Sequence, residues 1–192
     1  MKRLLTLLLP AILFTGCSTT PGDAAYRAGQ TKEAAELYRQ GAEQGSAQAA
    51  MKLGLLLNAG EVKPEAFGNA ALWFEKACNL GEMSGCHNAG VAYEYGKDGV
   101  SIDYLKARNY YYKAAERGYI QSQYNLGSLY SNKYFPEAFT GYTWMLIAEQ
   151  QAKDCLNNPL CQWILNDPPG HRAHLKARLT AEQIQQAKTS AA

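Results

Sequence analysis

The sequence predicts an all-α fold, a solenoid of stacked helical hairpins. Two sets of similar segments recur along the chain, and a glycine in each set returns after 36 and then 37 residues. A fixed period of roughly 20 to 50 residues is the signature of stacked-repeat architectures. The 192 residues are 47% hydrophobic, which suffices for a packed core. The recurring segments are residues 37–45, 73–81 and 110–118, followed after equal gaps by 53–56, 89–92 and 126–129.

The chain opens with the pattern of an export signal. Lys2 and Arg3 precede an apolar run from Leu4 to Phe14, which is well short of the roughly 20 residues that a membrane-spanning helix needs. Small residues follow this run at once, up to Cys17. We therefore expect residues 1–16 to be a signal peptide that is removed from the mature chain.

The end of this signal, Leu13-Phe14-Thr15-Gly16-Cys17, resembles the lipobox of bacterial lipoproteins. The resemblance implies that Cys17 becomes the first mature residue and carries lipid such as palmitate, which anchors the chain to a membrane. Ser18 stands where Asp commonly signals retention at the inner membrane, so we expect an outer-membrane lipoprotein that faces the periplasm. An ordinary signal peptide with a stray cysteine is the alternative. Residues 17–23 predict a short flexible lipidated tether.

Removal of the signal makes the chain neutral. The whole sequence has 19 basic and 17 acidic residues, a net charge of +2. Lys2 and Arg3 leave with the signal and no acidic residue precedes Asp23, so 17 residues of each sign remain. Nucleic-acid-binding domains carry a basic face that displaces counterions from phosphates. We therefore expect no nucleic-acid partner.

Each repeat predicts two helices. In the third repeat, apolar and small residues stand at the spacing of one helical face and end at Gly118, a residue suited to a left-handed helix cap. The recurring glycines Gly54, Gly90 and Gly127 fall inside the second helix, where Gly costs about 1 kcal/mol relative to Ala. Because they recur despite this cost, we expect neighbouring helices to approach closely there.

The third repeat reads YYYKAAERG from Tyr110 and QYNLGSLY from Gln123. This pattern resembles the Sel-1-like repeat, a relative of the tetratricopeptide repeat. The resemblance implies a right-handed α-solenoid whose first helices line the concave surface. A fourth, partial copy begins at Trp144, so we expect about three and a half helical-hairpin repeats over residues 24–151.

Five cysteines are an odd number, which needs an explanation in an exported protein. With Cys17 assigned to lipid, four remain, and an oxidising periplasm would pair them. The short separations favour Cys78 with Cys86 and Cys155 with Cys161 among the three possible pairings. The first spacing also resembles that of cysteine-rich Sel-1-like proteins, whose disulfide ties the two helices of one hairpin. Zinc is the alternative, although the paired C-x-x-C spacing of structural sites is absent.

Residues 152–192 depart from the repeat and predict a disulfide-stapled C-terminal helical cap. Asp167-Pro168-Pro169-Gly170 breaks regular structure, and Thr180 with Gln183 predicts a capping box that opens a last helix. Terminal repeats must present a polar outer face, which is the physical reason for a cap of different sequence.

The sequence shows no catalytic constellation. His87 follows Cys86 in a hairpin, and His171 and His174 lack an acidic or cysteine partner at ligand spacing, so we expect no metal and no cofactor. Two common serine-hydrolase motifs, Ser-x-x-Lys and Gly-x-Ser-x-Gly, are absent. We expect a protein that is not an enzyme. The alternative, taken from cysteine-rich relatives, is an enzyme or binder that acts on peptidoglycan or β-lactams.

Surface recognition is better supported. Eleven of the 13 tyrosines stand at or after position 93, and Tyr is favoured at interface hot spots. Tyr112 replaces polar residues of the earlier repeats, and two residues that precede it by seven and four share its helical face. We expect this face to bind a partner; packing against a neighbouring loop is the alternative. The candidate partner-binding residues are Leu105, Arg108, Tyr112, Arg39 and Glu75.

Together these observations predict a monomeric, lipid-anchored protein that binds another protein without catalysis. Lipoproteins of this type serve as immunity proteins that neutralise antibacterial effectors delivered into the periplasm, such as secreted lipases. Others act as adaptors in envelope assembly. The sequence leaves both roles open, and the partner is either a toxic effector or a component of an envelope complex.

Overall fold

The structure is a computed structural model that describes residues 20–132 and 134–191; the expected signal peptide and Cys17 lie outside the described residues. The described part is helical and contains no strand. Its helices are α1 (Pro21–Arg27), α2 (Thr31–Glu43), α3 (Ala47–Asn58), α4 (Pro64–Phe67), α5 (Ala70–Asn79), α6 (Met83–Tyr95), α7 (Tyr104–Ala115), α8 (Ile120–Leu129), α9 (Ala138–Lys153), α10 (Pro159–Asn166), α11 (His171–Lys176) and α12 (Ala181–Ser190).

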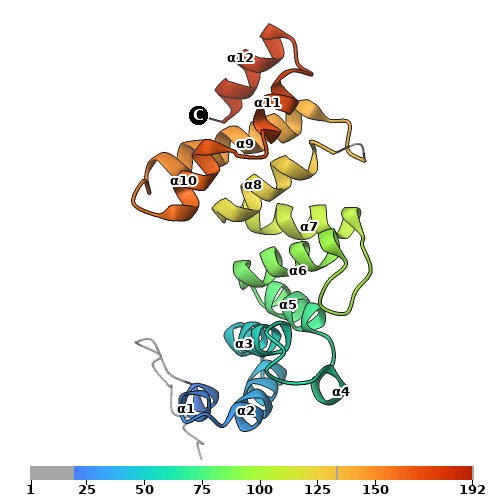
Figure 1. Cartoon of the computed structure of the whole chain (residues 1–192), viewed down its shortest axis with the longest axis vertical. Helices are drawn as coiled ribbons and strands as arrows, with labels where there is room; N and C mark the ends of the chain where they lie inside the picture. Colours follow the sequence, from blue (N-terminus) through green and yellow to red (C-terminus); the bar gives the residue numbers. More distant parts are fainter. Residues whose placement is uncertain (1–19, 133, 192) are drawn as a thin grey trace, which may run out of the picture.

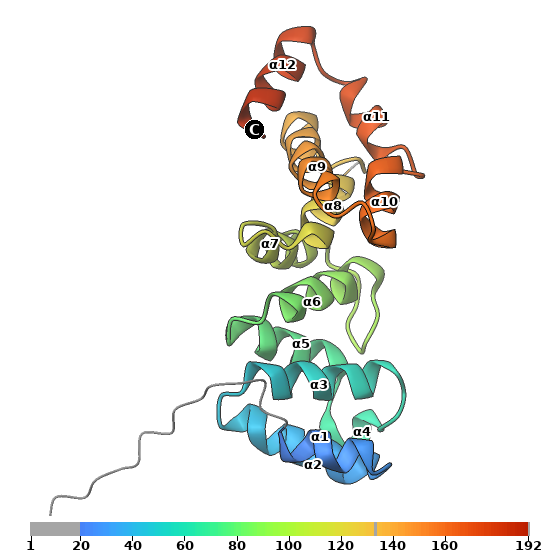
Figure 2. The same cartoon turned by 90° about the vertical axis from the view of Figure 1, so that its left-hand side faces the viewer.

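The helices stack along one long axis, with α1 and α2 at one end and α12 at the other (Figure 1). The view turned by 90° shows the same order of stacking (Figure 2). Helices α2 and α3, α5 and α6, and α7 and α8 form three hairpins, and α9 begins the partial fourth repeat. The second helix of each hairpin packs against the first helix of the next one. The predicted all-α solenoid is confirmed.

A glycine with positive φ closes the first helix of each hairpin. The φ angles of Gly45, Gly81 and Gly118 are 93°, 95° and 81°. An L-residue with a Cβ atom is strained in this region, whereas Gly is not. The predicted left-handed cap at Gly118 is therefore present, and the same turn recurs in the two earlier hairpins.

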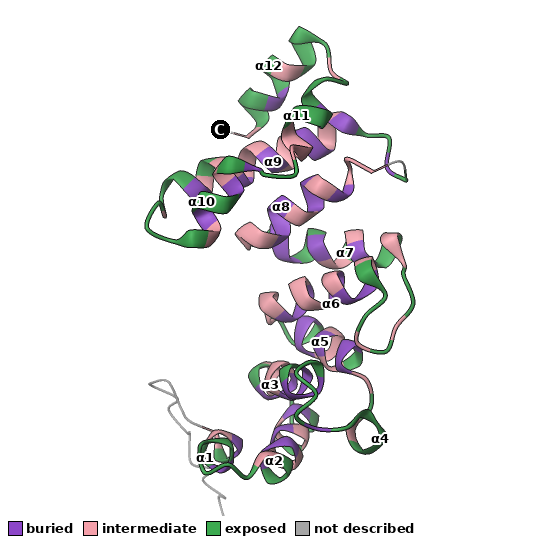
Figure 3. Cartoon of the chain, in the orientation of Figure 1, coloured by how far each residue is buried: buried purple, intermediate pink, exposed green. Residues whose placement is uncertain are grey.

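The glycines inside the second helices are sites of close helix packing, as the sequence predicts. A Cβ atom added at Gly54 would lie 2.6 Å from the Phe74 ring, and one added at Gly90 would lie 2.6 Å from the Tyr111 ring. At Gly127 the corresponding neighbour is Met145, also at 2.6 Å. Each second helix thus receives a large side chain from the next first helix. Buried positions accordingly occur in every helix of the three hairpins (Figure 3).

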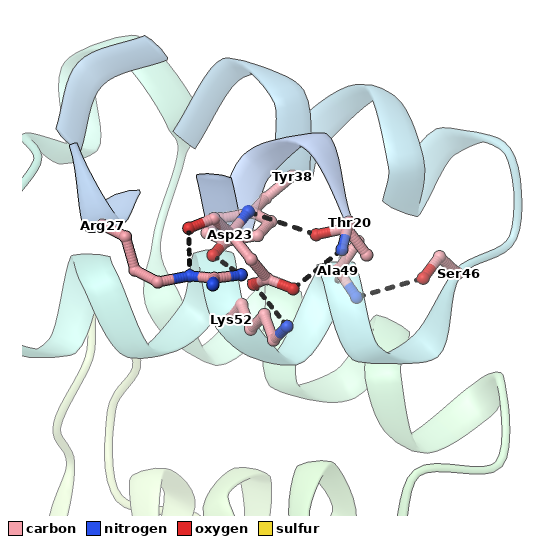
Figure 4. A network of polar contacts seen from close by, with 7 residues as sticks. All are labelled: Thr20, Asp23, Arg27, Tyr38, Ser46, Ala49 and Lys52. Atoms are coloured by element: carbon pink, nitrogen blue, oxygen red, sulfur yellow. Dashed lines mark hydrogen bonds and ion pairs between the residues drawn. The ribbon is translucent and has the colours of Figure 1, made fainter. Parts of the chain in front are cut away.

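The first described helix folds onto the solenoid, so the predicted tether of residues 17–23 is too long. Thr20 caps α1 in a capping box with Asp23, and helical structure begins at Pro21. The Asp23 carboxylate accepts a hydrogen bond of 2.7 Å from the Tyr38 hydroxyl and forms an ion pair with Lys52 (Figure 4). Burial acts to raise the pKa of Asp23, but hydrogen bonds from Lys52, Tyr38 and Thr20 outweigh it and hold the pKa well below its usual range.

Both predicted local cysteine pairs form disulfides in the structure. Cys78 and Cys86 join the end of α5 to α6, which are the two helices of one hairpin. Cys155 and Cys161 join the turn after α9 to α10. Each bond closes a short loop and restricts the unfolded chain.

The C-terminal cap packs around α9, which contacts α10, α11 and α12. Asp167 is buried at the end of α10, where it accepts hydrogen bonds from the Tyr124 hydroxyl at 2.7 Å and from the backbone N–H of Arg172 at 2.8 Å. This carboxylate therefore joins the cap to α8. The predicted capping box of Thr180 and Gln183 opens α12. None of the described helices has the length and apolarity to cross a membrane.

Candidate interaction surface

Two of the three candidate residues on α7, Leu105 and Tyr112, are exposed. Leu105 is 59% exposed and Tyr112 is 46% exposed. The ring of Tyr112 meets Trp144 of α9 edge-on, with 6.0 Å between the ring centroids. This contact fixes the direction of Tyr112 and leaves almost half of its surface free, so Leu105 and Tyr112 form an exposed apolar pair.

Arg108 differs from its two neighbours on α7, because it is only partly exposed. Its guanidinium lies over the Phe135 ring, 5.2 Å from the centroid, and Phe135 belongs to the connection between α8 and α9. The alternative interpretation, packing against a neighbouring loop, thus describes Arg108 but not Leu105 or Tyr112.

The two candidates from the earlier repeats have different surroundings. Arg39 pairs with Glu36 and, at 3.5 Å, with Glu43, and all three belong to α2. It does not join the α7 face. Glu75 of α5 accepts a hydrogen bond from the Tyr93 hydroxyl and lies beside Tyr112 at a common hollow. The structure therefore brings Glu75 and Tyr112 together and leaves Arg39 apart.

This hollow lies between α5 and α7 and has a volume of about 450 Å³. We call it the α5/α7 hollow. Its lining residues are Glu75, Lys106, Asn109, Tyr110, Tyr112 and Lys113. Four of these residues, Lys106, Asn109, Tyr110 and Lys113, are not among the candidates that the sequence predicts. The repeat alignment does contain a signal for Lys113, because it matches Lys76 one repeat earlier. Each of these two lysines lies over the aromatic ring three residues before it, at 5.4 Å for Lys76 and 5.2 Å for Lys113.

Tyr110, which lines the α5/α7 hollow, packs against Tyr93 of α6. The rings of Tyr93 and Tyr110 are stacked, with centroids 5.8 Å apart and planes 5° apart. Lys106 lies over Tyr93, 4.7 Å from the centroid. Burial and the neighbouring Glu75 carboxylate raise the pKa of Tyr110 to about 12, and they raise the pKa of Tyr93 further. Both phenols therefore stay neutral at physiological pH, and their ring faces attract the lysine ammonium groups.

A second polar cluster joins α6 to α8 inside the solenoid. The Nδ1 atom of His87 lies 3.0 Å from the Oγ atom of Ser122, and the imidazole sits between the rings of Tyr111 and Tyr119. Burial lowers the pKa of His87 to about 4. Ser122 is fully buried and His87 is partly buried, so the pair lies largely within the solenoid.

The other two histidines lie in the cap. His171 Nδ1 is 2.8 Å from the Ser131 hydroxyl, and His174 is exposed. Over residues 20–132 and 134–191, no group of three or more His, Cys, Asp and Glu side chains is placed to hold a metal ion.

The chain matches a protein-family model and several solved structures. A family model described as Sel1 repeat matches residues 23–46, 47–82, 84–119 and 120–132, together more than half of the chain. A search of curated proteins found no match.

Among solved structures, the chain is similar to a Sel1 repeat protein from Oxalobacter formigenes, with a TM-score of 0.60 and 24% identity over 88% of this chain and 69% of that chain. This likeness shows the fold. The chain also matches c5321, a protective antigen present in uropathogenic Escherichia coli strains that displays an SLR fold. The TM-score is 0.48, with 21% identity over 88% of this chain and 50% of that one.

Proposed function

The chain belongs to the Sel1 repeat family, and we propose that it is a lipid-anchored, non-catalytic protein that binds a partner protein through the exposed face of α7. Sel1 repeats generally mediate protein–protein interactions, and this chain is suited to that role. The observation that carries the proposal is the exposed pair of Leu105 and Tyr112 on α7, of which Tyr112 also lines the α5/α7 hollow. Aromatic residues in such settings often dominate binding energy.

The most specific role that we propose is that of an immunity protein, which neutralises an antibacterial effector delivered into the periplasm, such as a secreted lipase. Envelope assembly adaptor is the second role. The export signal and lipobox-like segment support both, since each job requires a protein held at the envelope. Hydrolysis of peptidoglycan or a β-lactam by the purified protein would contradict both roles.

The partner-binding face is tested by replacing both exposed residues, Leu105→Glu with Tyr112→Ala. We expect capture of the partner from envelope extracts, quantified by mass spectrometry, to fall at least tenfold, because truncation of a hot-spot residue costs about 2 kcal/mol or more. The matched control is Leu55→Glu on α3, a leucine that is 45% exposed and lies outside the proposed face. Equal capture by the double variant and the wild-type protein would exclude this face.

The two roles are separated by a survival assay. Cells that export a candidate effector to the periplasm are protected by an immunity protein, and the Leu105 and Tyr112 variant should protect them less. An adaptor gives no protection, but its loss weakens assembly of the complex that it serves. If the wild-type chain protects the cells and the double variant protects them equally well, the immunity surface lies elsewhere.

The proposed anchor, Cys17, stands three residues before Thr20, the cap of α1. An extended chain spans at most about 3.6 Å per residue, so Thr20 lies within about 11 Å of Cys17. A lipid on Cys17 would therefore hold the start of α1 at that distance from the anchored residue. Because α1 is fixed to Tyr38 and Lys52, we propose that the N-terminal end of the solenoid lies close to the membrane.

Labelling with a palmitate analogue tests the anchor. We expect the wild-type chain to incorporate label and sediment with membranes, and the Cys17→Ser variant to lose both. Ser18→Ala is the control and should keep label and outer-membrane location. Ser18→Asp should keep the label but move to the inner membrane. A wild-type chain without label would refute lipidation while leaving the partner-binding face open to its own test.

A further inference from the structure

We propose that the α5/α7 hollow binds carboxylate groups of an acidic segment in the partner protein. The inference rests on the proposed function, because it names the chemistry that this same face recognises. It is carried by two lysine side chains that line the hollow together and lack an acidic partner within the described chain.

Lys106 and Lys113 stand on one side of α7, seven residues apart, which is about 10 Å along a helix. Neither forms an ion pair with any residue in 20–132 or 134–191. Both ammonium groups are held over tyrosine rings, Lys106 at 4.7 Å from the Tyr93 centroid and Lys113 at 5.2 Å from the Tyr110 centroid. The stacked rings thus order two positive charges before any ligand arrives, which lowers the entropy cost of binding.

Glu75 is the one carboxylate in the lining, and its position leaves both lysines available. It accepts the hydrogen bond from the Tyr93 hydroxyl and lies beyond ion-pair distance from Lys106 and Lys113. Asn109 is exposed between the two lysines and adds an amide donor. The lining therefore offers two ammonium groups and an amide to a ligand. The Glu75 carboxylate disfavours binding of an anion on the α5 side of the hollow.

Charges of both signs lie just outside the hollow, including Asp103, whose charge acts on Tyr93, and Glu116, which is hydrogen-bonded to Tyr112. Lys76 lies over Trp73 on α5, and Lys113 also faces a neighbouring hollow of about 350 Å³ with Glu116 and Arg117. Exposed leucines stand on both helices that form the α5/α7 hollow, Leu72 on α5 and Leu105 on α7. The matching ligand is a peptide segment with acidic side chains and some apolar ones.

The excess of positive charge in the α5/α7 hollow is not shared by the hollow at the N-terminal end of the solenoid. A hollow of about 890 Å³ beside α2 is lined by the carboxylates of Glu33, Glu36 and Glu61 and by one cation, Lys32. An acidic segment would be repelled there and attracted to α5 and α7. A membrane surface is a poorer match, because recognition of anionic lipid uses clusters of about four to eight Lys or Arg residues, whereas two lysines line this hollow.

Binding of defined peptides tests the inference. The whole chain in a mild detergent is titrated into a fluorescent 12-residue peptide of alternating glutamate and leucine, and into a twin with glutamine in place of glutamate. We expect the glutamate peptide to bind at least tenfold more tightly than its twin, with an affinity that falls as salt rises. The double variant Lys106→Met and Lys113→Met should lose at least tenfold of this affinity.

Matched variants keep the result specific. Lys106→Arg with Lys113→Arg retains both charges and should retain binding, and Lys32→Met beside α2 should bind as the wild-type chain does. Circular dichroism checks that each variant is folded. Equal affinity for the two peptides, undiminished binding by the double Met variant, or lysine-dependent binding of vesicles containing phosphatidylglycerol in place of the peptide would each overturn the inference.

The outcome is distinguishable from a failure of the proposed function. If the wild-type chain captures a partner through Leu105 and Tyr112 but ignores the glutamate peptide, the acidic ligand is wrong and the binding face stands. If the peptide binds as expected but no partner depends on the face, the proposed function fails and the carboxylate site stands.

Discussion

Gly90→Val is expected to destabilise the protein by about 3 kcal/mol or more, because it forces a side chain into the contact between α6 and α7. Gly90 is buried, and a Cβ atom there would lie 2.6 Å from two atoms of the Tyr111 ring. Tyr111 is itself fully buried and donates a hydrogen bond of 2.6 Å to Glu94, so its ring has no space into which to move. Urea unfolding followed by circular dichroism measures the change.

For the smaller substitution Gly90→Ala, the sign of the change in unfolding free energy tests the packing. In an open helix, Ala would stabilise by about 1 kcal/mol relative to Gly. Here we expect a loss of about 2 kcal/mol, since the added methyl meets an aromatic ring. Gly41→Ala in α2 is the control: its nearest neighbour is the Ala49 methyl at 3.1 Å, and no ring lies against it. A stabilising effect of Gly90→Ala would contradict the close packing of the repeats.

Acidification is expected to destabilise the protein through His87. Burial lowers the pKa of His87 to about 4, whereas an unfolded histidine titrates near 6.5. The folded state therefore requires the neutral imidazole. Stability from this group is complete above pH 6.5 and is lost as pH falls toward 4, by roughly 2 to 3 kcal/mol at pH 4.5.

The substitution His87→Gln isolates this effect. It removes the titrating ring, and we expect the difference in unfolding free energy between pH 7.5 and pH 4.5 to shrink by roughly 2 to 3 kcal/mol relative to the wild-type protein. Other titrating groups, such as Glu94, whose pKa burial raises, are present in both proteins and cancel in the comparison. His174→Gln, at an exposed position, is the control and should keep the wild-type pH dependence. A pH profile of His87→Gln parallel to that of the wild-type protein would refute this account.

The same packing that these two predictions probe also holds the proposed binding face in place. Tyr111 faces inward from α7, against Gly90 and Glu94, while Tyr112 is the next residue and faces outward beside Trp144. A variant that loosens the contact between α6 and α7 should therefore weaken partner binding without touching the surface itself. Partner-binding assays accordingly need variants whose unfolding free energy is known.

The repeat period, the hairpins and the exposure of α7 follow from the sequence. Each hairpin buries its apolar face against its neighbours, so the spacing of Tyr111, Ala114 and Ala115 determines which side of α7 faces outward. Leu105 and Tyr112 lie on that side as predicted. The cysteine pairs are also local, which is why short separations sufficed to choose the pairing.

Only the tertiary structure shows which side chains from different helices meet. The stacking of Tyr93 on Tyr110, the packing of Arg108 on Phe135 and the docking of α1 depend on the distance and rotation between helices. The period of a repeat specifies neither quantity, because the same period allows different side chains across each helix contact. The sequence therefore predicts a solenoid in which one side of α7 is exposed, whereas the distance and rotation between α5 and α7 place Lys106, Lys113 and Glu75 around one hollow.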